Sequence, residues 1–123
     1  MNRQQARHLL ARASLAVAFI GIGLWEIVQP SYWLGYVPQF LNFLPADYVL
    51  LAEGVVITSL GAAVLLGVYL KAVAGLSALV MLSVIASVIV STGFTDIVIR
   101  DIALFLIAAS LYFDDVAYLR LIG

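Results

Sequence analysis

Four long apolar runs dominate the chain and restrict the folds open to it. They cover residues 9–28, 48–70, 72–90 and 97–113, and short polar or proline-containing connections separate them. About 20 consecutive apolar residues are enough for an α-helix to cross the hydrocarbon core of a bilayer. The sequence therefore predicts an all-α fold, a transmembrane four-helix bundle that forms one integral membrane domain over residues 1–123.

The composition supports a membrane class and excludes several functions. Of the 123 residues, 65% are hydrophobic and 11% are charged, whereas soluble domains are about half apolar and a quarter charged. The net charge of −1 leaves no basic surface for nucleic acid. The chain has no cysteine, so disulfides, thiol redox chemistry and iron–sulfur clusters are excluded. The expected partner of most of its surface is the lipid bilayer.

The first apolar run follows a basic segment with Arg3, Arg7 and Arg12. This order is also found in cleaved signal peptides, but the run is long and no Ala-x-Ala-like site with a polar start follows it. A retained first transmembrane helix is the preferred interpretation.

The connection between the first two runs, residues 29–47, is rich in proline and aromatic residues. Its three prolines break any continuous helix: Pro30, Pro38 and Pro45. Its main aromatic residues are Tyr32, Trp33, Tyr36, Phe40 and Phe43. Because Trp and Tyr favour the headgroup level of a bilayer, we expect an interfacial aromatic loop that caps the bundle. It would act as a simple anchor or as a lid over a ligand pocket.

The distribution of Lys and Arg predicts the orientation. With four spans, five basic residues share the side of the two termini: Arg3, Arg7, Arg12, Lys71 and Arg120. The other side has only Arg100. By the positive-inside rule, the chain is a multi-pass protein of the plasma membrane with both termini cytoplasmic.

Four ionisable residues within the apolar runs are expected at one depth. Glu26 ends the first run, Glu53 lies about five residues into the second, and Arg100 and Asp101 lie about five residues into the fourth. At a rise of 1.5 Å per residue, all four lie within about 10 Å of the outer boundary. Charged groups at membrane depth are costly and tend to face a protein interior with partners, so a shared polar cluster is expected.

The predicted cluster has three carboxyl groups and one guanidinium. Like charges cannot all stay ionised in a medium of low dielectric constant, so either a carboxyl is protonated or a cation, a ligand or a second protein supplies the missing charge. Three interpretations remain open: a polar knot that fixes helix register, a site for a small polar or quinone-like headgroup, and a path for protons or ions.

The sequence lacks the residues that metal, cofactor and common catalytic sites require. His8, the only histidine, is expected to be solvated at the cytoplasmic membrane surface. Haem and zinc sites need several well-placed ligands, so no metal site and no intrinsic cofactor are expected. There is no glycine-rich phosphate loop and no Ser/His/Asp set, and catalytic residues are unknown.

Several short motifs resemble the DoxX-like family of small four-helix membrane proteins. They are Pro30-x-Tyr32-Trp33-x-Gly35-Tyr36-x-Pro38, Glu53-Gly54 with Gly61 and Leu66-Gly67, and Ile99-Arg100-Asp101-Ile102-Ala103-Leu104. The resemblance covers roughly residues 10–113. It implies a four-helix bundle and a link to sulfur-compound oxidation or oxidative-stress complexes, since some relatives are described as subunits of a thiosulfate:quinone oxidoreductase. The chain departs from the family at Glu26, where related sequences often carry a basic residue.

The resemblance makes an accessory or quinone-associated subunit of a membrane redox complex the leading expectation. A bound quinone and a redox partner subunit or a homo-oligomer would accompany that role, with Glu26, Glu53, Arg100, Asp101, Trp33 and Tyr36 at the site. A small proton-coupled transporter and a purely structural membrane subunit are the alternatives. The transporter is less favoured because Glu26 and Glu53 are expected near one edge of the membrane rather than at its middle.

Overall fold

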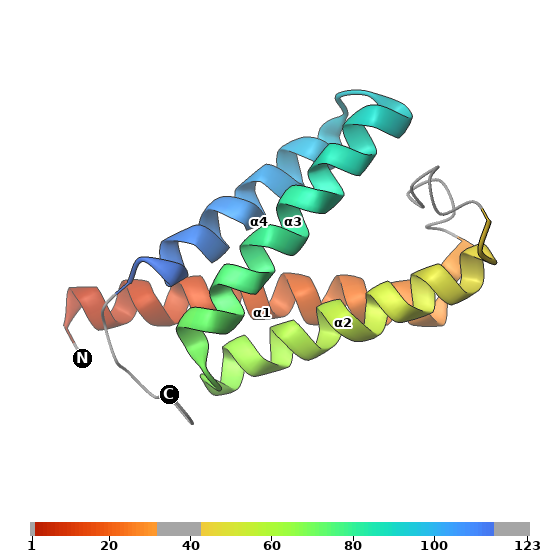
Figure 1. Ribbon diagram of the computed structural model, residues 1–123. Helices are drawn as coiled ribbons and strands as arrows, with labels where there is room; N and C mark the ends of the chain where they lie inside the picture. The colour runs from red at the N-terminus through yellow and green to blue at the C-terminus, as the bar shows by residue number, and fades with distance from the viewer. Residues whose placement is uncertain (1, 32–42, 115–123) are drawn as a thin grey trace.

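The protein is a bundle of four α-helices in a computed structural model that describes residues 2–31 and 43–114 (Figure 1). The helices are α1 (Arg3–Val28), α2 (Ala46–Leu66), α3 (Leu70–Thr92) and α4 (Asp96–Tyr112). Within these residues the chain forms no strand, which confirms the predicted all-α class.

The helices are arranged as two antiparallel hairpins. The packing of α1 on α2 and of α3 on α4 is much more extensive than that between the hairpins. Figure 1 shows the α3–α4 hairpin crossing the α1–α2 hairpin obliquely, so that the two diverge toward the end where α1 finishes and α4 begins. The turn between α2 and α3 lies at the opposite end, together with the N-terminus and the end of α4.

One apolar core joins all four helices. It includes Leu15 and Phe19 of α1, Val64 of α2, Ala74 of α3 and Leu111 of α4, all at most 1% exposed. Many other large apolar side chains lie on the outer surface of the helices instead, among them Val17, Val55, Leu79, Val90 and Leu106. An apolar exterior around an apolar core is the arrangement that lipid favours.

Three helices are long and apolar enough to cross a membrane: Arg3–Val28, Ala46–Leu66 and Leu70–Val90. Helix α4 has 17 residues, which correspond to about 25 Å at 1.5 Å per residue and to the lower limit for a span. The length and composition of these helices are typical of a membrane-embedded protein.

The helix ends differ from the prediction at two places. α1 begins at Arg3 rather than near residue 9, because Asn2 and Gln5 form a capping box in which each side chain accepts a hydrogen bond from the other residue's backbone N–H. The second run ends at Leu66 rather than near residue 70, because Gly67 adopts a left-handed conformation (φ 76°) and its N–H donates to Ala63 O.

The turn between the hairpins therefore consists of residues 67–69, and Lys71 lies inside α3 rather than in the turn. Tyr69 also has a positive φ, of 43°. This conformation is costly for a residue with a side chain, which makes the link between the hairpins a point of backbone strain.

Candidate functional site

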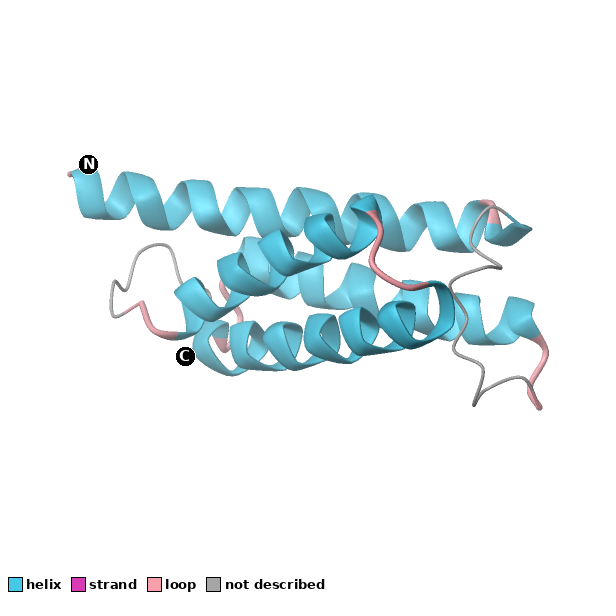
Figure 2. Cartoon of the chain, turned by 90° about the horizontal axis from the view of Figure 1, so that it is seen from above, coloured by secondary structure: helices cyan, strands magenta, loops and turns pink. Residues whose placement is uncertain are grey.

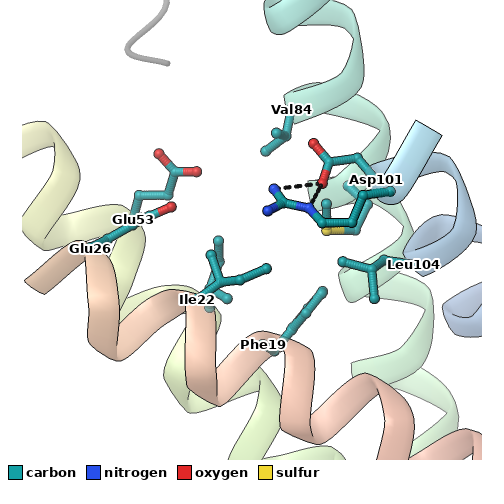
Figure 3. Close-up of a pocket in the computed structure, with 10 residues that line it drawn as sticks. Phe19, Ile22, Glu26, Glu53, Val84, Asp101 and Leu104 are labelled. Atoms are coloured by element: carbon teal, nitrogen blue, oxygen red, sulfur yellow. Dashed lines mark hydrogen bonds and ion pairs between the residues drawn. The ribbon is translucent and has the colours of Figure 1, made fainter. Parts of the chain in front are cut away.

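A small cavity lies between the two hairpins near their diverging ends, with a volume of about 30 Å³. All four helices contribute to its wall, and Figure 3 draws the lining side chains. Six of them are apolar: Phe19, Ile22, Ile57, Met81, Val84 and Leu104. The other four are Glu26, Glu53, Arg100 and Asp101. The structure thus places around one cavity the four ionisable residues that the sequence predicted to share a layer.

Close contact between α1 and α2 places the two glutamates together. A Cβ atom at Gly23 would lie 2.8 Å from the carbonyl oxygen of Gly54, and one at Gly54 would lie 2.7 Å from the carbonyl oxygen of Gly23. The two backbones can approach this closely because neither residue has a side chain. Glu26 follows Gly23 by one helical turn and Glu53 is next to Gly54. Both carboxyl groups therefore reach the same side of the cavity, as Figure 3 shows.

Asp101 lies on the other side of the cavity and is 1% exposed. Its Oδ1 accepts hydrogen bonds from the adjacent Arg100, from Nη2 at 3.1 Å and from Nε at 3.2 Å. The Arg100 side chain is 41% exposed, so this ion pair joins a buried carboxylate to a guanidinium at the edge of the bundle. The carboxyl group of Glu26 interacts electrostatically with Glu53, Arg100 and Asp101.

Two carboxylate oxygens in the cavity wall accept no hydrogen bond from the described residues. They are Oε2 of Glu26, a residue that is 4% exposed, and Oδ2 of Asp101. A buried polar atom without a partner costs about 1–3 kcal/mol, and buried polar groups in native proteins are normally satisfied. A cavity that holds one water needs about 10–15 Å³, so this one admits a water molecule or a polar group of similar size.

Most of the described ionisable residues are segregated by charge along the bundle, and the exception is Asp114, which lies beside His8. Lys71 and the three arginines of the α1 amino-terminal half lie toward the end that carries the α2–α3 turn (Figure 1). The other end has one basic residue, Arg100, and five acidic residues: Glu26, Asp47, Glu53, Asp96 and Asp101. The acidic cavity therefore lies at the end opposite the basic one. Trp33, Tyr36 and the rest of the predicted aromatic loop lie outside the described residues.

The prediction that His8 is solvated is wrong. His8 is 1% exposed, and its Nδ1 lies 2.8 Å from Oδ2 of Asp114, just after α4. Arg12, on the same face of α1, is 2% exposed and donates to two carbonyl groups at the end of α2, from Nε to Val64 O (3.1 Å) and from Nη2 to Leu65 O (2.8 Å). A cation at a helix carboxyl end also complements the helix dipole.

The spacing of residues along α1 could have indicated that His8 and Arg12 face the inside of the bundle. His8 and Glu26 are 18 positions apart, about five turns at 3.6 residues each, and the face between them carries buried residues at intervals of three or four. Both ends of the buried face of α1 are therefore polar. Figure 2 shows α1 running the full length of the molecule beside the other helices.

Metal chemistry receives no support from the described residues, which contain no group of three His, Cys, Asp or Glu side chains that could hold a metal ion. The groups of the cavity that could act chemically are its carboxyl groups, which accept hydrogen bonds or exchange protons. Arg100 holds one of them, that of Asp101, in place by hydrogen bonds.

No family model, no curated protein and no solved structure matches the chain. The resemblance to the DoxX-like family therefore stays a prediction.

Proposed function

We propose that the protein is a membrane-embedded subunit that binds the polar headgroup of a lipid-soluble molecule in the cavity between its hairpins. A quinone-type molecule is the proposed ligand, and an accessory role in a membrane redox complex is the proposed context, in line with the resemblance to DoxX-like proteins. The chain would lie in the plasma membrane with both termini cytoplasmic and the cavity toward the outer side.

The observation that carries this proposal is the pair of buried carboxylate oxygens, Glu26 Oε2 and Asp101 Oδ2, that line one cavity without a hydrogen-bond partner among the described residues. A purely structural polar knot would be expected to satisfy its buried members, because an unsatisfied one is costly. The apolar remainder of the wall suits the ring or tail of a molecule that arrives from the lipid.

The size of the cavity limits how such a ligand is held. Pockets for whole cofactors or drug-sized molecules have volumes of about 300–1,000 Å³, about ten times the volume found here. The cavity admits one polar substituent of the headgroup. The ring would lie in the opening between the diverging hairpins, so ligand binding requires those ends to move apart.

The test is purification of the protein from membranes in a gentle detergent, followed by mass spectrometry of both extracted lipid-soluble molecules and companion proteins. We expect a quinone-type molecule in about stoichiometric amount together with a redox subunit. Asp101→Asn should reduce the bound molecule severalfold. Asp96→Asn removes the same charge from an exposed position on the same helix and should not. Pure preparations that contain neither ligand nor partner would refute the proposal.

A second function, proton-coupled transport, is favoured by one observation. The cavity is close to the size of a water molecule and three of its wall residues carry carboxyl groups, which is a suitable arrangement for taking up and releasing a proton. Flux driven by a pH gradient in liposomes, lost in Glu53→Gln and kept in Asp96→Asn, would establish this function in place of the first.

A further inference from the structure

The end of the bundle opposite the cavity carries a basic surface. Arg3 and Arg7, one turn apart on α1, and Lys71, in the first turn of α3, are exposed. None of the three forms an ion pair with a carboxylate among the described residues. The described carboxylate at this end is that of Asp114, which contacts the buried His8 instead. The exposed charge that the described residues present at this end is therefore positive.

The start of α1 projects beyond the helix that it packs against. Arg12 donates hydrogen bonds to the last carbonyl groups of α2, so residues 3–11 extend past that end, over about 14 Å at 1.5 Å per residue. Figure 2 shows the amino-terminal end of α1 projecting beyond the other helices. Because the apolar run begins near residue 9, Arg3 and Arg7 lie beyond the hydrocarbon core, at the level of the lipid headgroups.

Two exposed tyrosines lie at the same end on the other hairpin. They are Tyr69, in the turn before α3, and Tyr112, at the end of α4. The Nζ atom of Lys71 lies 5.4 Å from the centroid of the Tyr112 ring, a cation–π contact that holds the ammonium group at this surface. Tyrosine favours the headgroup level of a bilayer, so the rings and the cations lie together where lipid phosphates lie.

We propose that this basic surface binds the headgroups of anionic phospholipids, with Arg3, Arg7 and Lys71 as the contact residues. Each Lys or Arg near an anionic membrane surface is attracted to it, and none of these three is neutralised by a described carboxylate. The surface lies at the end opposite the cavity, and the inference does not depend on the ligand proposed for the cavity.

The experiment is native mass spectrometry of the full chain in a non-ionic detergent, titrated with phosphatidylglycerol or with phosphatidylcholine of the same acyl chains. Both lipids have one phosphate, but the quaternary ammonium of phosphatidylcholine cancels its charge. We expect an affinity for phosphatidylglycerol that is about tenfold higher or more, from two or three such contacts. The preference should shrink as the salt concentration rises from about 0.01 M to about 1 M, because salt screens exposed charges.

Substitutions at the three positions locate the site. Arg3→Gln, Arg7→Gln and Lys71→Gln each remove one exposed charge, and each should lower the affinity for phosphatidylglycerol about fivefold while the affinity for phosphatidylcholine stays nearly unchanged. The matched control combines Arg3→Lys, Arg7→Lys and Lys71→Arg, which keeps every charge and should keep the preference. The titration of the unaltered chain and its salt dependence decide the question even where a substituted chain folds poorly.

Each outcome either supports the inference or overturns it. A preference for phosphatidylglycerol that falls in the glutamine variants and is kept in the control supports it. Equal affinity of the unaltered chain for the two lipids overturns it and leaves an acidic protein segment as the partner that the charge would fit. A preference that persists unchanged in all three glutamine variants overturns the assignment to this end. Glycerol 3-phosphate has the anionic headgroup without the tails, so its displacing the lipid at equal concentration would show a site for free phosphate and overturn the inference.

Discussion

A methyl group added at Gly23 is expected to force α1 and α2 apart beside the cavity. The Cβ atom of an alanine at this position would lie 2.8 Å from the carbonyl oxygen of Gly54 and 2.9 Å from the backbone nitrogen of Thr58. Cβ contacts below 3.0 Å essentially never occur in real proteins. The nearest atom, Oγ1 of Thr58, could move by a side-chain rotation, but the two backbone atoms could not, so the helices have to separate to relieve the clash.

The size of the effect follows from a matched glycine two residues earlier. Nothing lies within 4 Å of a Cβ atom at Gly21, so Gly21→Ala should stabilise the protein by about 0.5–1 kcal/mol through helix propensity alone. Gly23→Ala gains the same amount but adds overpacking, which costs about 1–3 kcal/mol. The free energies of unfolding of the two variants should therefore differ by about 1–3 kcal/mol, with Gly23→Ala the less stable.

The assay is reversible unfolding of both variants in detergent micelles by increasing mole fraction of sodium dodecyl sulfate, followed by far-ultraviolet circular dichroism. Because both variants carry the same substitution on the same helix, differences in detergent affinity largely cancel. Equal stabilities, or a more stable Gly23→Ala, would refute the close approach of α1 and α2. Gly23→Ala should also weaken ligand binding, because Glu26 and Glu53 move apart with their helices.

Three further predictions concern the basic end of the bundle and the turn, each checked by the same unfolding assay. Arg12→Ala should lower the free energy of unfolding by about 2 kcal/mol because Leu65 O at the end of α2 loses its charged donor. The control is Arg7→Ala, at an exposed position, which should change stability by less than about 0.5 kcal/mol. Similar losses in the two variants would contradict the capping role of Arg12. Asp114→Ala should cost about 1–3 kcal/mol by leaving the buried Nδ1 of His8 without this carboxylate, and unchanged stability would contradict that contact. Tyr69→Gly should stabilise the protein by about 0.5–1 kcal/mol, since it removes strain at a positive φ while losing little buried surface. A destabilised variant would show that the tyrosine side chain packs more than its exposure indicates.

The sequence predicted the helical class and the shared depth of the four ionisable residues of the cavity wall for a simple physical reason. Long apolar runs permit few structures other than helices in lipid. A charged residue inside such a run has to face the bundle, so Glu26, Glu53, Arg100 and Asp101 could be assigned to one layer by counting residues from the helix ends. The orientation of the chain in the membrane and its redox role stay predictions.

Residues near the helix ends were harder to assign. A basic residue beside a membrane surface can be solvated or can turn inward, and hydropathy does not distinguish the two. The inward position of His8 and Arg12 depends on partners that are distant in sequence, Asp114 and the final carbonyl groups of α2. The turn at residues 67–69 was misplaced for a local reason, because the capping conformation of Gly67 outweighs the apolar residues that follow it.

The polar contacts of α1 explain why the cavity lies at the end where the hairpins diverge. At the basic end, His8 of α1 contacts Asp114 beyond α4, which joins the two hairpins close to the strained turn that also connects them. At the other end, the hairpins face each other with carboxyl groups on both sides, Glu26 and Glu53 opposite Asp101 (Figure 3). Glu26 Oε2 and Asp101 Oδ2 have no hydrogen-bond partner among the described residues, so these two oxygens form no direct bond between the hairpins. This end is therefore the one at which the hairpins are expected to move apart when a ligand enters, while the contact of His8 with Asp114 holds the other end together.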